Sequence, residues 1–292
     1  MIVEAEAVAD IAARHLGTNP DDEVRFLGQR DFNTWEVGGE FILRFAVDDE
    51  SDAAARREVA VLPHLASVLE VEVPRFDFVD TFGEGYRVVG YRKVQGLDGE
   101  DYRIGAEERP QLVQQFARLL KSLHAVPGDA FEVDIPLWSP AEPALQVERI
   151  VRYASVIREQ VPELVTPSMA EYLGGRVALP RWEYPLVVAH ADLKGEHLLF
   201  ESGRLHAVID WADICLTDPA VDLGALATCV DPIFVREVGA AYGASEATIE
   251  RALFFSRAYM LVGLGRLLTG KNHWPKDLVS KQVARAFAEG HS

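Results

Sequence analysis

The first third of the chain combines two segments of helical periodicity with several short runs of strand character. Residues 3–16 and 53–69 have apolar side chains three to four positions apart, which predicts two helices. Turn residues such as Gly38-Gly39 separate the shorter runs, as in antiparallel hairpins. These runs cover residues 24–27, 32–37, 40–46, 74–79 and 86–94. The pattern therefore predicts a small antiparallel sheet accompanied by helices.

Helical periodicity dominates after about residue 107, and no internal repeat is present. We expect helices at residues 107–123, 143–160, 163–173, 222–229, 232–242, 245–268 and 275–288. One strand-rich stretch interrupts them, with apolar runs at residues 187–188, 198–200 and 207–209. A chain of 292 residues is long for one core, so we expect an α+β fold with two lobes around a cleft.

The strand-rich stretch carries carboxylates where its strands end. Asp192 follows the first apolar run, and Asp210 follows the last. Phosphoryl transfer to a hydroxyl needs one carboxylate to take the proton of the acceptor, and a second carboxylate with a further ligand to hold magnesium. We therefore interpret Asp192 as the base, and Asp210 and His197 as the metal ligands.

The residues around Asp192 resemble a kinase active site. His190-Ala191-Asp192-Leu193-Lys194-Gly195-Glu196-His197 is similar to the H-R-D-x-x-x-x-N pattern, and Ile209-Asp210-Trp211 stands in the position of D-F-G. The intervals of five residues from Asp192 to His197 and eighteen to Asp210 are those of the aminoglycoside phosphotransferase family of antibiotic kinases. Because His197 replaces the usual Asn, the resemblance is closest to the aminoglycoside 2″-phosphotransferase and macrolide phosphotransferase branches.

The resemblance covers most of residues 24–230 and implies a protein-kinase-like fold. Residues 1–93 would form an N-terminal nucleotide-binding lobe with the antiparallel sheet. Residues 94–292 would form a mostly helical lobe with the catalytic loop, the metal site and the acceptor pocket. The nucleotide would lie in the cleft between them.

The resemblance also implies a nucleotide site in the first lobe. Arg44 would contact the α- and β-phosphates, held by an ion pair with Glu58 of the next helix; the alternative is a surface salt bridge of little energetic value. The turn between Leu27 and Asn33 occupies the place of a phosphate-covering loop, although it has only one glycine. Backbone groups of Tyr91, Arg92 and Lys93 would hydrogen-bond the purine edge, unless this segment is simply an edge strand.

The implied enzyme is a phosphotransferase that requires Mg²⁺ and uses ATP or GTP to phosphorylate a hydroxyl of a small molecule. Lys194 would act on the γ-phosphate or on the acceptor. We expect a polycationic aminoglycoside as the acceptor, and thus an antibiotic-resistance kinase. Asp213 and Asp231 would then bind the amino groups of the acceptor.

Four other interpretations stay open. Phe254, Phe255 and Tyr259 would suit a macrolide or another small metabolite if they faced the cleft. A protein kinase is less consistent with the sequence, because no G-x-G-x-x-G loop or A-P-E segment is present. His190, Asp192, His197 and Asp210 could also hold the metal of a hydrolase, but no H-E-x-x-H motif occurs. A nucleotide-binding protein without transfer activity is the last alternative.

The charge, the cysteine content and the lengths of the apolar runs limit the classes of binding partner. The net charge of −17, from 29 basic and 46 acidic residues, disfavours nucleic acid and weakly favours a cationic substrate. Cys215 and Cys229 are too few for a disulfide framework or a zinc motif. We expect a cytoplasmic monomer that does not bind membranes, because no apolar run approaches the roughly 20 residues of a membrane span.

Overall fold

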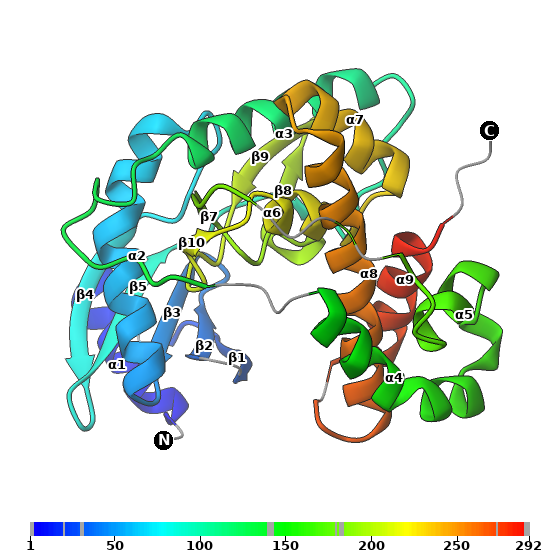
Figure 1. The fold of residues 1–292 in the computed structure, drawn as a ribbon. Helices are drawn as coiled ribbons and strands as arrows, with labels where there is room; N and C mark the ends of the chain where they lie inside the picture. Colours follow the sequence, from blue (N-terminus) through cyan, green and yellow to red (C-terminus); the bar gives the residue numbers. More distant parts are fainter. Residues whose placement is uncertain are drawn as a thin grey trace.

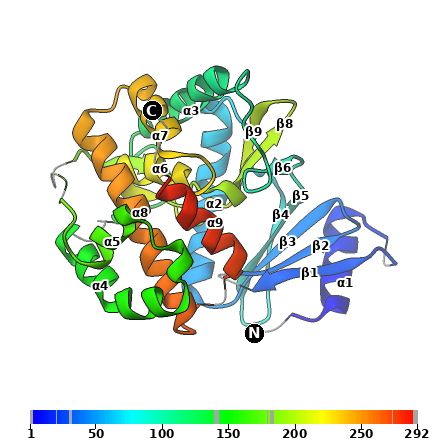
Figure 2. The ribbon, with the colours of Figure 1, turned by 90° about the vertical axis from the view of Figure 1, so that its right-hand side faces the viewer.

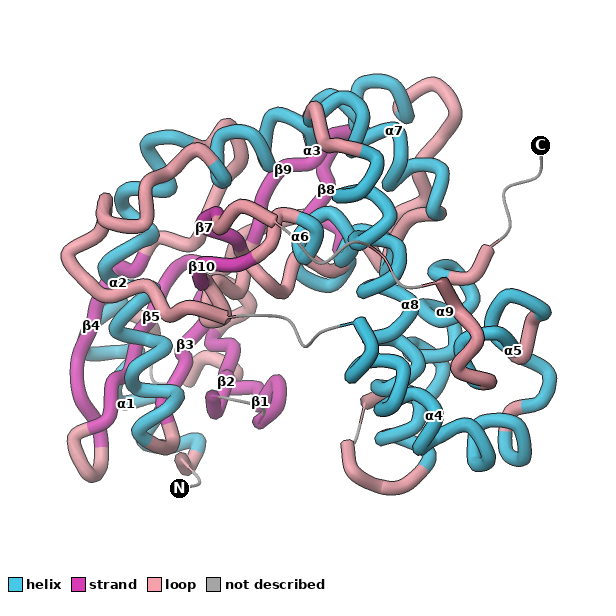
Figure 3. Tube along the Cα trace, viewed as in Figure 1, coloured by secondary structure: helices cyan, strands magenta, loops and turns pink. Residues whose placement is uncertain are grey.

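The computed structural model describes residues 3–19, 21–29, 32–138, 143–178, 180, 184–272 and 274–288. A twisted sheet with two helices forms one end of the molecule, and a group of helices forms the other (Figure 1). Smaller strands lie between them (Figure 3). Arg30 and Asp31, at the tip of the predicted phosphate-covering turn, are outside the described residues.

The large sheet has five strands in the order β1-β2-β3-β5-β4, and every neighbouring pair is antiparallel. Its strands are β1 (Val24–Gln29), β2 (Phe32–Val37), β3 (Phe41–Ala46), β4 (Phe76–Phe82) and β5 (Tyr86–Arg92). The antiparallel sheet predicted from the hairpin pattern is therefore confirmed. Helix α1 (Ala5–Leu16) packs Val8 and Ile11 on a sheet face that includes Leu43 and Phe45.

Helix α2 (Asp49–Val68) begins four residues before the predicted start at Ala53. Asp48 accepts a hydrogen bond from the backbone N–H of Ser51, and Ser51 Oγ accepts one from the N–H of Asp48. This reciprocal cap satisfies donors that the first turn of a helix cannot pair internally. The helix packs Ala54 and Ala55 near Phe32 and Ala46 of the sheet. Glu58 consequently lies in mid-helix and is fully buried.

The helical end of the molecule is built around α8, which runs through its centre (Figure 2). Its helices are α3 (Arg109–His124), α4 (Pro143–Gln160), α5 (Pro167–Leu173), α6 (Ala220–Ala225), α7 (Pro232–Tyr242), α8 (Glu246–Leu268) and α9 (Lys276–Ala286). Short 3₁₀ turns cover Pro162–Leu164, Gly195–His197 and Leu226–Thr228. The predicted helix at residues 163–173 is thus two pieces, because Thr166 caps a new helix that starts at Pro167.

Five short strands connect the two ends of the molecule. They are β6 (Leu97–Asp98), β7 (Val187–Ala189), β8 (Leu198–Glu201), β9 (Arg204–Val208) and β10 (Cys215–Thr217). The apolar runs at residues 198–200 and 207–209 belong to the antiparallel hairpin of β8 and β9, and β6 extends it into a three-stranded sheet. Sequence periodicity missed β6 and β10 because runs of two or three residues carry no measurable alternation.

A buried ion pair fixes the segment after β10 to α8. Asp218 accepts hydrogen bonds from Arg251 Nε at 2.7 Å and Nη2 at 3.1 Å, and both side chains are almost completely buried. Within the described part of the chain, no helix is both long enough and apolar enough to cross a membrane.

Candidate active site

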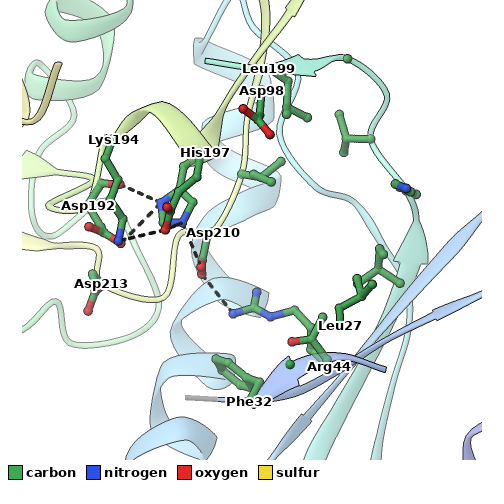
Figure 4. A pocket seen from close by; sticks show the side chains of 18 of the residues that line it. Leu27, Phe32, Arg44, Asp98, Asp192, Lys194, His197, Leu199, Asp210 and Asp213 are labelled. Carbon is green, nitrogen blue, oxygen red and sulfur yellow. Dashed lines mark hydrogen bonds and ion pairs between the residues drawn. The ribbon is translucent and has the colours of Figure 1, made fainter. Parts of the chain in front are cut away.

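A cleft of about 860 Å³ lies between the five-stranded sheet and the strands that follow α5 (Figure 4). We refer to residues 190–197 as the Asp192 loop and to residues 209–212 as the Asp210 turn. The cleft brings together most of the residues predicted from the sequence. These are Arg44, Tyr91, Lys93, Asp192, Lys194, His197, Asp210 and Asp213.

The predicted ion pair between Arg44 and Glu58 is confirmed. Arg44 Nη1 lies 2.9 Å from both carboxylate oxygens of Glu58, and both side chains are buried. Glu58 Oε1 also accepts a hydrogen bond from the backbone N–H of Trp211 at 3.1 Å. Helix α2 is therefore connected to strand β3 and to the Asp210 turn through one carboxylate, a link that sequence spacing did not reveal.

Arg44 also reaches the opposite wall of the cleft. Its Nη2 lies 3.2 Å from Asp210 Oδ1, and its guanidinium lies 4.1 Å above the ring of Phe32. Burial alone would lower the pKa of Arg44, but the charges of Glu58 and Asp210 raise it. The guanidinium is therefore a fixed positive charge at the centre of the cleft.

The Asp192 loop holds a lysine between two carboxylates. Lys194 Nζ lies 3.0 Å from Asp192 Oδ2 and 3.2 Å from Glu196 Oε1. Burial lowers the pKa of Lys194, but the two carboxylates outweigh it and raise the pKa to about 12. The loop thus presents one carboxylate and one permanent ammonium side by side.

His197 has its tautomer set by the backbone. Its Nδ1 lies 2.8 Å from the carbonyl oxygen of Asp192, an acceptor only, so Nδ1 carries the proton and donates it there. The lone pair is then on Nε2, which lies 3.4 Å from Asp210 Oδ2. Burial would raise the pKa of Asp210, but the positive charge of Arg44 outweighs it and contributes most to a pKa of about 2. An imidazole lone pair and an ionised carboxylate therefore face the same point.

Two residues with left-handed backbone flank this chemistry. Ala191 has φ of 65° and Asp210 has φ of 61°, a conformation that is costly for residues other than glycine. Ala191 is held by Asp222, whose Oδ1 accepts from the Ala191 N–H at 2.8 Å and whose Oδ2 accepts from the His190 N–H at 3.0 Å. Asp222 is completely buried, so it positions the Asp192 loop without reaching the cleft.

His190 connects the Asp192 loop to the Asp210 turn. Its Nδ1 accepts from the Asp192 N–H at 3.2 Å, and its Nε2 donates to the Ile209 carbonyl at 3.1 Å. Burial lowers the pKa of His190, and this hydrogen-bond pattern requires the neutral imidazole. His190 therefore holds the Asp192 loop in place and is not among the residues that line the cleft.

The linker after β5 differs from the prediction in its backbone hydrogen bonds. The N–H of Arg92 donates to Asp77, and the N–H of Lys93 donates to the Glu40 carbonyl at 2.7 Å. These two donors are consequently satisfied within the sheet. Tyr91 is buried, and burial raises the pKa of its hydroxyl to about 12.

Apolar side chains line the part of the cleft next to this linker. Ile42 comes from β3, Val94 from the linker, and Leu199 and Ile209 from the opposite wall. We refer to this apolar part of the cleft as the slot, and apolar walls of this kind suit the binding of an aromatic ring. No sequence pattern indicated the slot, because its walls come from segments more than 100 residues apart.

A second pocket, of about 250 Å³, opens on the other side of Asp192 and Lys194. Its walls include Phe255, Met260 and the exposed Tyr259 of α8. Tyr259 also lines the large cleft, so the two spaces are adjacent. Other residues that line the second pocket are Trp138, Gln146, Arg149, Val221 and Ser256.

The aromatic residues singled out in α8 separate into two groups. Phe255 and Tyr259 face the second pocket, whereas Phe254 is 3% exposed and packs near Tyr172. Helical geometry explains the difference, because consecutive residues point about 100° apart.

Of the two carboxylates predicted to bind an acceptor, only Asp213 lines the cleft. The predicted placement of Asp231 is wrong. Asp231 is not among the described residues that line the cleft or the second pocket. Asp231 caps α7 by accepting from the Phe234 N–H at 2.7 Å, and it pairs with Arg109. Its sequence position marked a helix N-cap, a common role for Asp.

Comparisons with known proteins agree with this geometry. A model of the phosphotransferase enzyme family matches residues 23–255. Viomycin phosphotransferase of Streptomyces vinaceus is 30% identical over 169 residues, which are 54% of this chain and 56% of that protein. The match thus spans little more than half the length of this relative.

Solved structures of similar shape include two kinds of phosphotransferase. The GDP complex of wild-type aminoglycoside 2′-phosphotransferase-IIIa has a TM-score of 0.70 at 21% identity and covers 97% of both chains. A macrolide 2′-phosphotransferase from Brachybacterium faecium, in its apoenzyme form, has a TM-score of 0.59 at 20% identity and covers 98% of this chain and 99% of its own. These similarities confirm the predicted kinase-like fold.

Proposed function

This chain belongs to the phosphotransferase enzyme family, and we propose that it transfers the γ-phosphoryl group of a nucleoside triphosphate to a hydroxyl of a small molecule. The observation that carries this proposal is the convergence of Asp192, His197, Asp210 and Arg44 on one cleft, with Arg44 from the five-stranded sheet and the other three from the segment between β7 and β10.

Asp192 acts on the acceptor. The oxygen of the acceptor hydroxyl attacks the γ-phosphorus, and the bond from that phosphorus to the bridging oxygen of the β-phosphate breaks. The hydroxyl proton passes to the carboxylate of Asp192. Lys194, 3.0 Å from Asp192, supplies positive charge where the transferred group carries negative charge.

Asp210 and His197 would hold a magnesium ion. Magnesium commonly uses one or two protein ligands and completes its shell with phosphate oxygens and water, so a site with few protein donors is suitable. Among the described residues, no cluster of three or more ligand side chains is present, which agrees with such a site. When bound, the metal would neutralise phosphate charge; Asp210 supplies the oxygen donor it prefers, and His197 Nε2 is the weaker, nitrogen donor.

The remaining residues would bind the nucleotide. Arg44 is fixed by Glu58 and meets the phosphates with a charge that does not titrate. The purine would occupy the slot between Ile42 and Ile209. Because the N–H groups of Arg92 and Lys93 are already satisfied, we assign the hydrogen bonds to the purine edge to the backbone of Val94, the next linker residue lining the cleft.

The acceptor binds in the pocket beside Asp192. The sequence favours an aminoglycoside as the acceptor. Asp213 supports this choice, because it lines the cleft and could bind an amino group of the acceptor. However, the only carboxylate among the described residues lining the second pocket is Asp192, and Arg149 there is a cation. The apolar wall of Phe255, Tyr259 and Met260 therefore favours the second candidate, a macrolide or small-metabolite kinase that accepts an apolar body.

The proposed function is tested with a coupled assay of ADP or GDP release. The protein is supplied with magnesium, ATP or GTP, and a panel of aminoglycosides, macrolides, and sugar or choline-like alcohols. Acceptor-dependent release that disappears in Asp192→Ala supports the proposal. Binding of MgATP without release for any acceptor would favour a nucleotide-binding protein that performs no transfer.

A further inference from the structure

Helices α4 and α8 lie side by side at the helical end of the molecule (Figures 1 and 2). Two pockets lie along the interface between these helices. The first is the pocket beside Asp192, and the second, of about 210 Å³, lies further along both helices. Arg149 of α4 lines both spaces, so the two are adjacent.

The second space is lined mainly by cations, and we refer to it as the basic site. Arg149 and Arg152 come from α4, Arg266 comes from α8, and Lys271 follows α8. No carboxylate is among the described residues that line it. In a chain with 29 basic and 46 acidic residues, four cations together without an acidic neighbour are not expected from composition.

Among the described residues, no carboxylate neutralises the charges of the basic site. In the described ranges, no ion pair joins any of these four cations to a carboxylate. Glu148 precedes Arg152 by four residues, a spacing at which helix ion pairs form, yet the two side chains are not paired. Lys271 instead lies 5.6 Å from the ring of Tyr153. Like charges held together repel one another, so this arrangement is stabilised when an anion binds.

We propose that the basic site binds an anionic group carried by the acceptor whose hydroxyl is phosphorylated at Asp192. This inference rests on the proposed function and names the acceptor class: a hydroxyl compound with an apolar body and a carboxylate, phosphate or sulfate group. The hydroxyl lies at Asp192, the body lies against Phe255 and Met260, and the anionic group lies beyond Arg149.

Two features favour an anion that belongs to the acceptor over a free ion. The shared lining residue, Arg149, places the basic site next to the acceptor pocket, within reach of a molecule that extends past Arg149. Arginine side chains also present paired N–H donors that match the oxygens of a carboxylate or phosphate. A polycationic acceptor would bring its ammonium groups against these four cations, which opposes binding.

The test uses two fluorescent glycosides that share a fluorophore and most sugar hydroxyls. The glucuronide of 4-methylumbelliferone carries a carboxylate where the glucoside carries a hydroxymethyl group. Binding is measured by titration calorimetry with wild-type protein, with Arg152→Ala/Arg266→Ala, and with the control Arg158→Ala/Arg236→Ala. The control removes the same charge from exposed positions outside the basic site.

Wild-type protein and the control should bind the glucuronide roughly tenfold more tightly than the glucoside, as for a gained charge-assisted hydrogen bond. Arg152→Ala/Arg266→Ala should lose this preference. Equal affinities in the wild type, no binding of the glucuronide, or an unchanged preference in the double variant would overturn the inference. Sulfate is titrated in parallel with MgADP saturating the nucleotide site, and sulfate binding without a glycoside preference would mean a free anion and also overturn it.

MgATP binding is measured on the same preparations. If MgATP binds, the coupled assay shows acceptor-dependent release, and the glycosides show no preference, the proposed function stands and only the acceptor class is wrong. If MgATP does not bind, the proposed function fails, and the glycoside titrations still decide whether the basic site recognises a carboxylate.

Discussion

Asp210 accepts a hydrogen bond from Arg44 across the cleft, with 3.2 Å between Oδ1 and Nη2. The two residues come from different parts of the molecule, since Arg44 lies in the five-stranded sheet and Asp210 follows β9 of the smaller three-stranded sheet. The pair therefore couples the two walls at the place where we propose that nucleotide phosphates and metal bind. When the nucleotide and the metal are bound, Arg44 would pair with phosphate oxygens and Asp210 with the metal. Each of these interactions would be stronger than the hydrogen bond between the two side chains.

Removing the carboxylate that holds Arg44 should weaken both the fold and nucleotide binding. In Glu58→Gln, the amide replaces a charged acceptor of three hydrogen bonds, so we expect the free energy of unfolding to fall by about 1–3 kcal/mol. Nucleotide affinity should fall roughly tenfold because Arg44 loses its fixed position. Denaturant unfolding and MgATP titration measure these effects. Glu40→Gln, in an exposed pair with Arg92, is the control and should change neither property measurably.

Asp192 should contribute to turnover and little to nucleotide binding. A general base accelerates transfer by about 10²–10⁴-fold, so Asp192→Ala should lose that factor in kcat. Its affinity for MgATP should stay close to wild type, because Asp192 faces the acceptor. Steady-state kinetics and calorimetry together check this split. Transfer at the wild-type rate would show that the assignment of the base is wrong.

The two proposed metal ligands should differ in their tolerance of substitution. Asp210→Asn removes the ionised oxygen donor, and we expect no measurable transfer. His197→Asn should keep part of the activity, because an amide oxygen suits magnesium better than an imidazole nitrogen does. The measurement is the magnesium dependence of each variant. An unaltered requirement in both variants is the result that contradicts this assignment.

The buried His190 should make stability fall at mildly acidic pH. Its pKa is lowered in the folded state by burial, so below the ordinary value of 6.5 the unfolded chain binds a proton that the folded chain does not. The free energy of unfolding should then fall by up to about 1.4 kcal/mol for each pH unit below that value. His190→Gln should show a shallower dependence in denaturant unfolding between pH 8 and 5. A substitution at the half-buried His206 is the control, and equal slopes for His190→Gln and the wild type would refute this prediction.

Breaking the buried ion pair of α8 should destabilise the helical end of the molecule. Arg251→Met leaves Asp218 buried without its partner, at a cost of about 3–5 kcal/mol. Arg236→Met removes an arginine from an exposed pair with Glu246 and should cost less than about 1 kcal/mol. Thermal or denaturant unfolding of the two variants gives the comparison. Similar costs for both would mean that burial of the Arg251 pair has no special energetic role.

The sequence alone determined the class of fold and the identity of the central residues. Periodicity of two and of 3.6 is a local property, so strands and helices could be predicted without knowing their neighbours. The intervals between Asp192, His197 and Asp210 are also local, because one hairpin connects them. The resemblance to antibiotic kinases further implied the ion pair between Arg44 and Glu58 that the structure confirms.

Only the tertiary structure decided how the rest of the chain surrounds those residues. Asp222 holds the Asp192 loop, and the sheet satisfies the N–H groups of Arg92 and Lys93. Asp231 turns away to cap a helix, whereas α4 and α8 bring Arg149 and Arg266 into one basic site. Each of these outcomes depends on which faces of distant segments meet. Packing of the whole core selects those faces, and no interval along the chain specifies them.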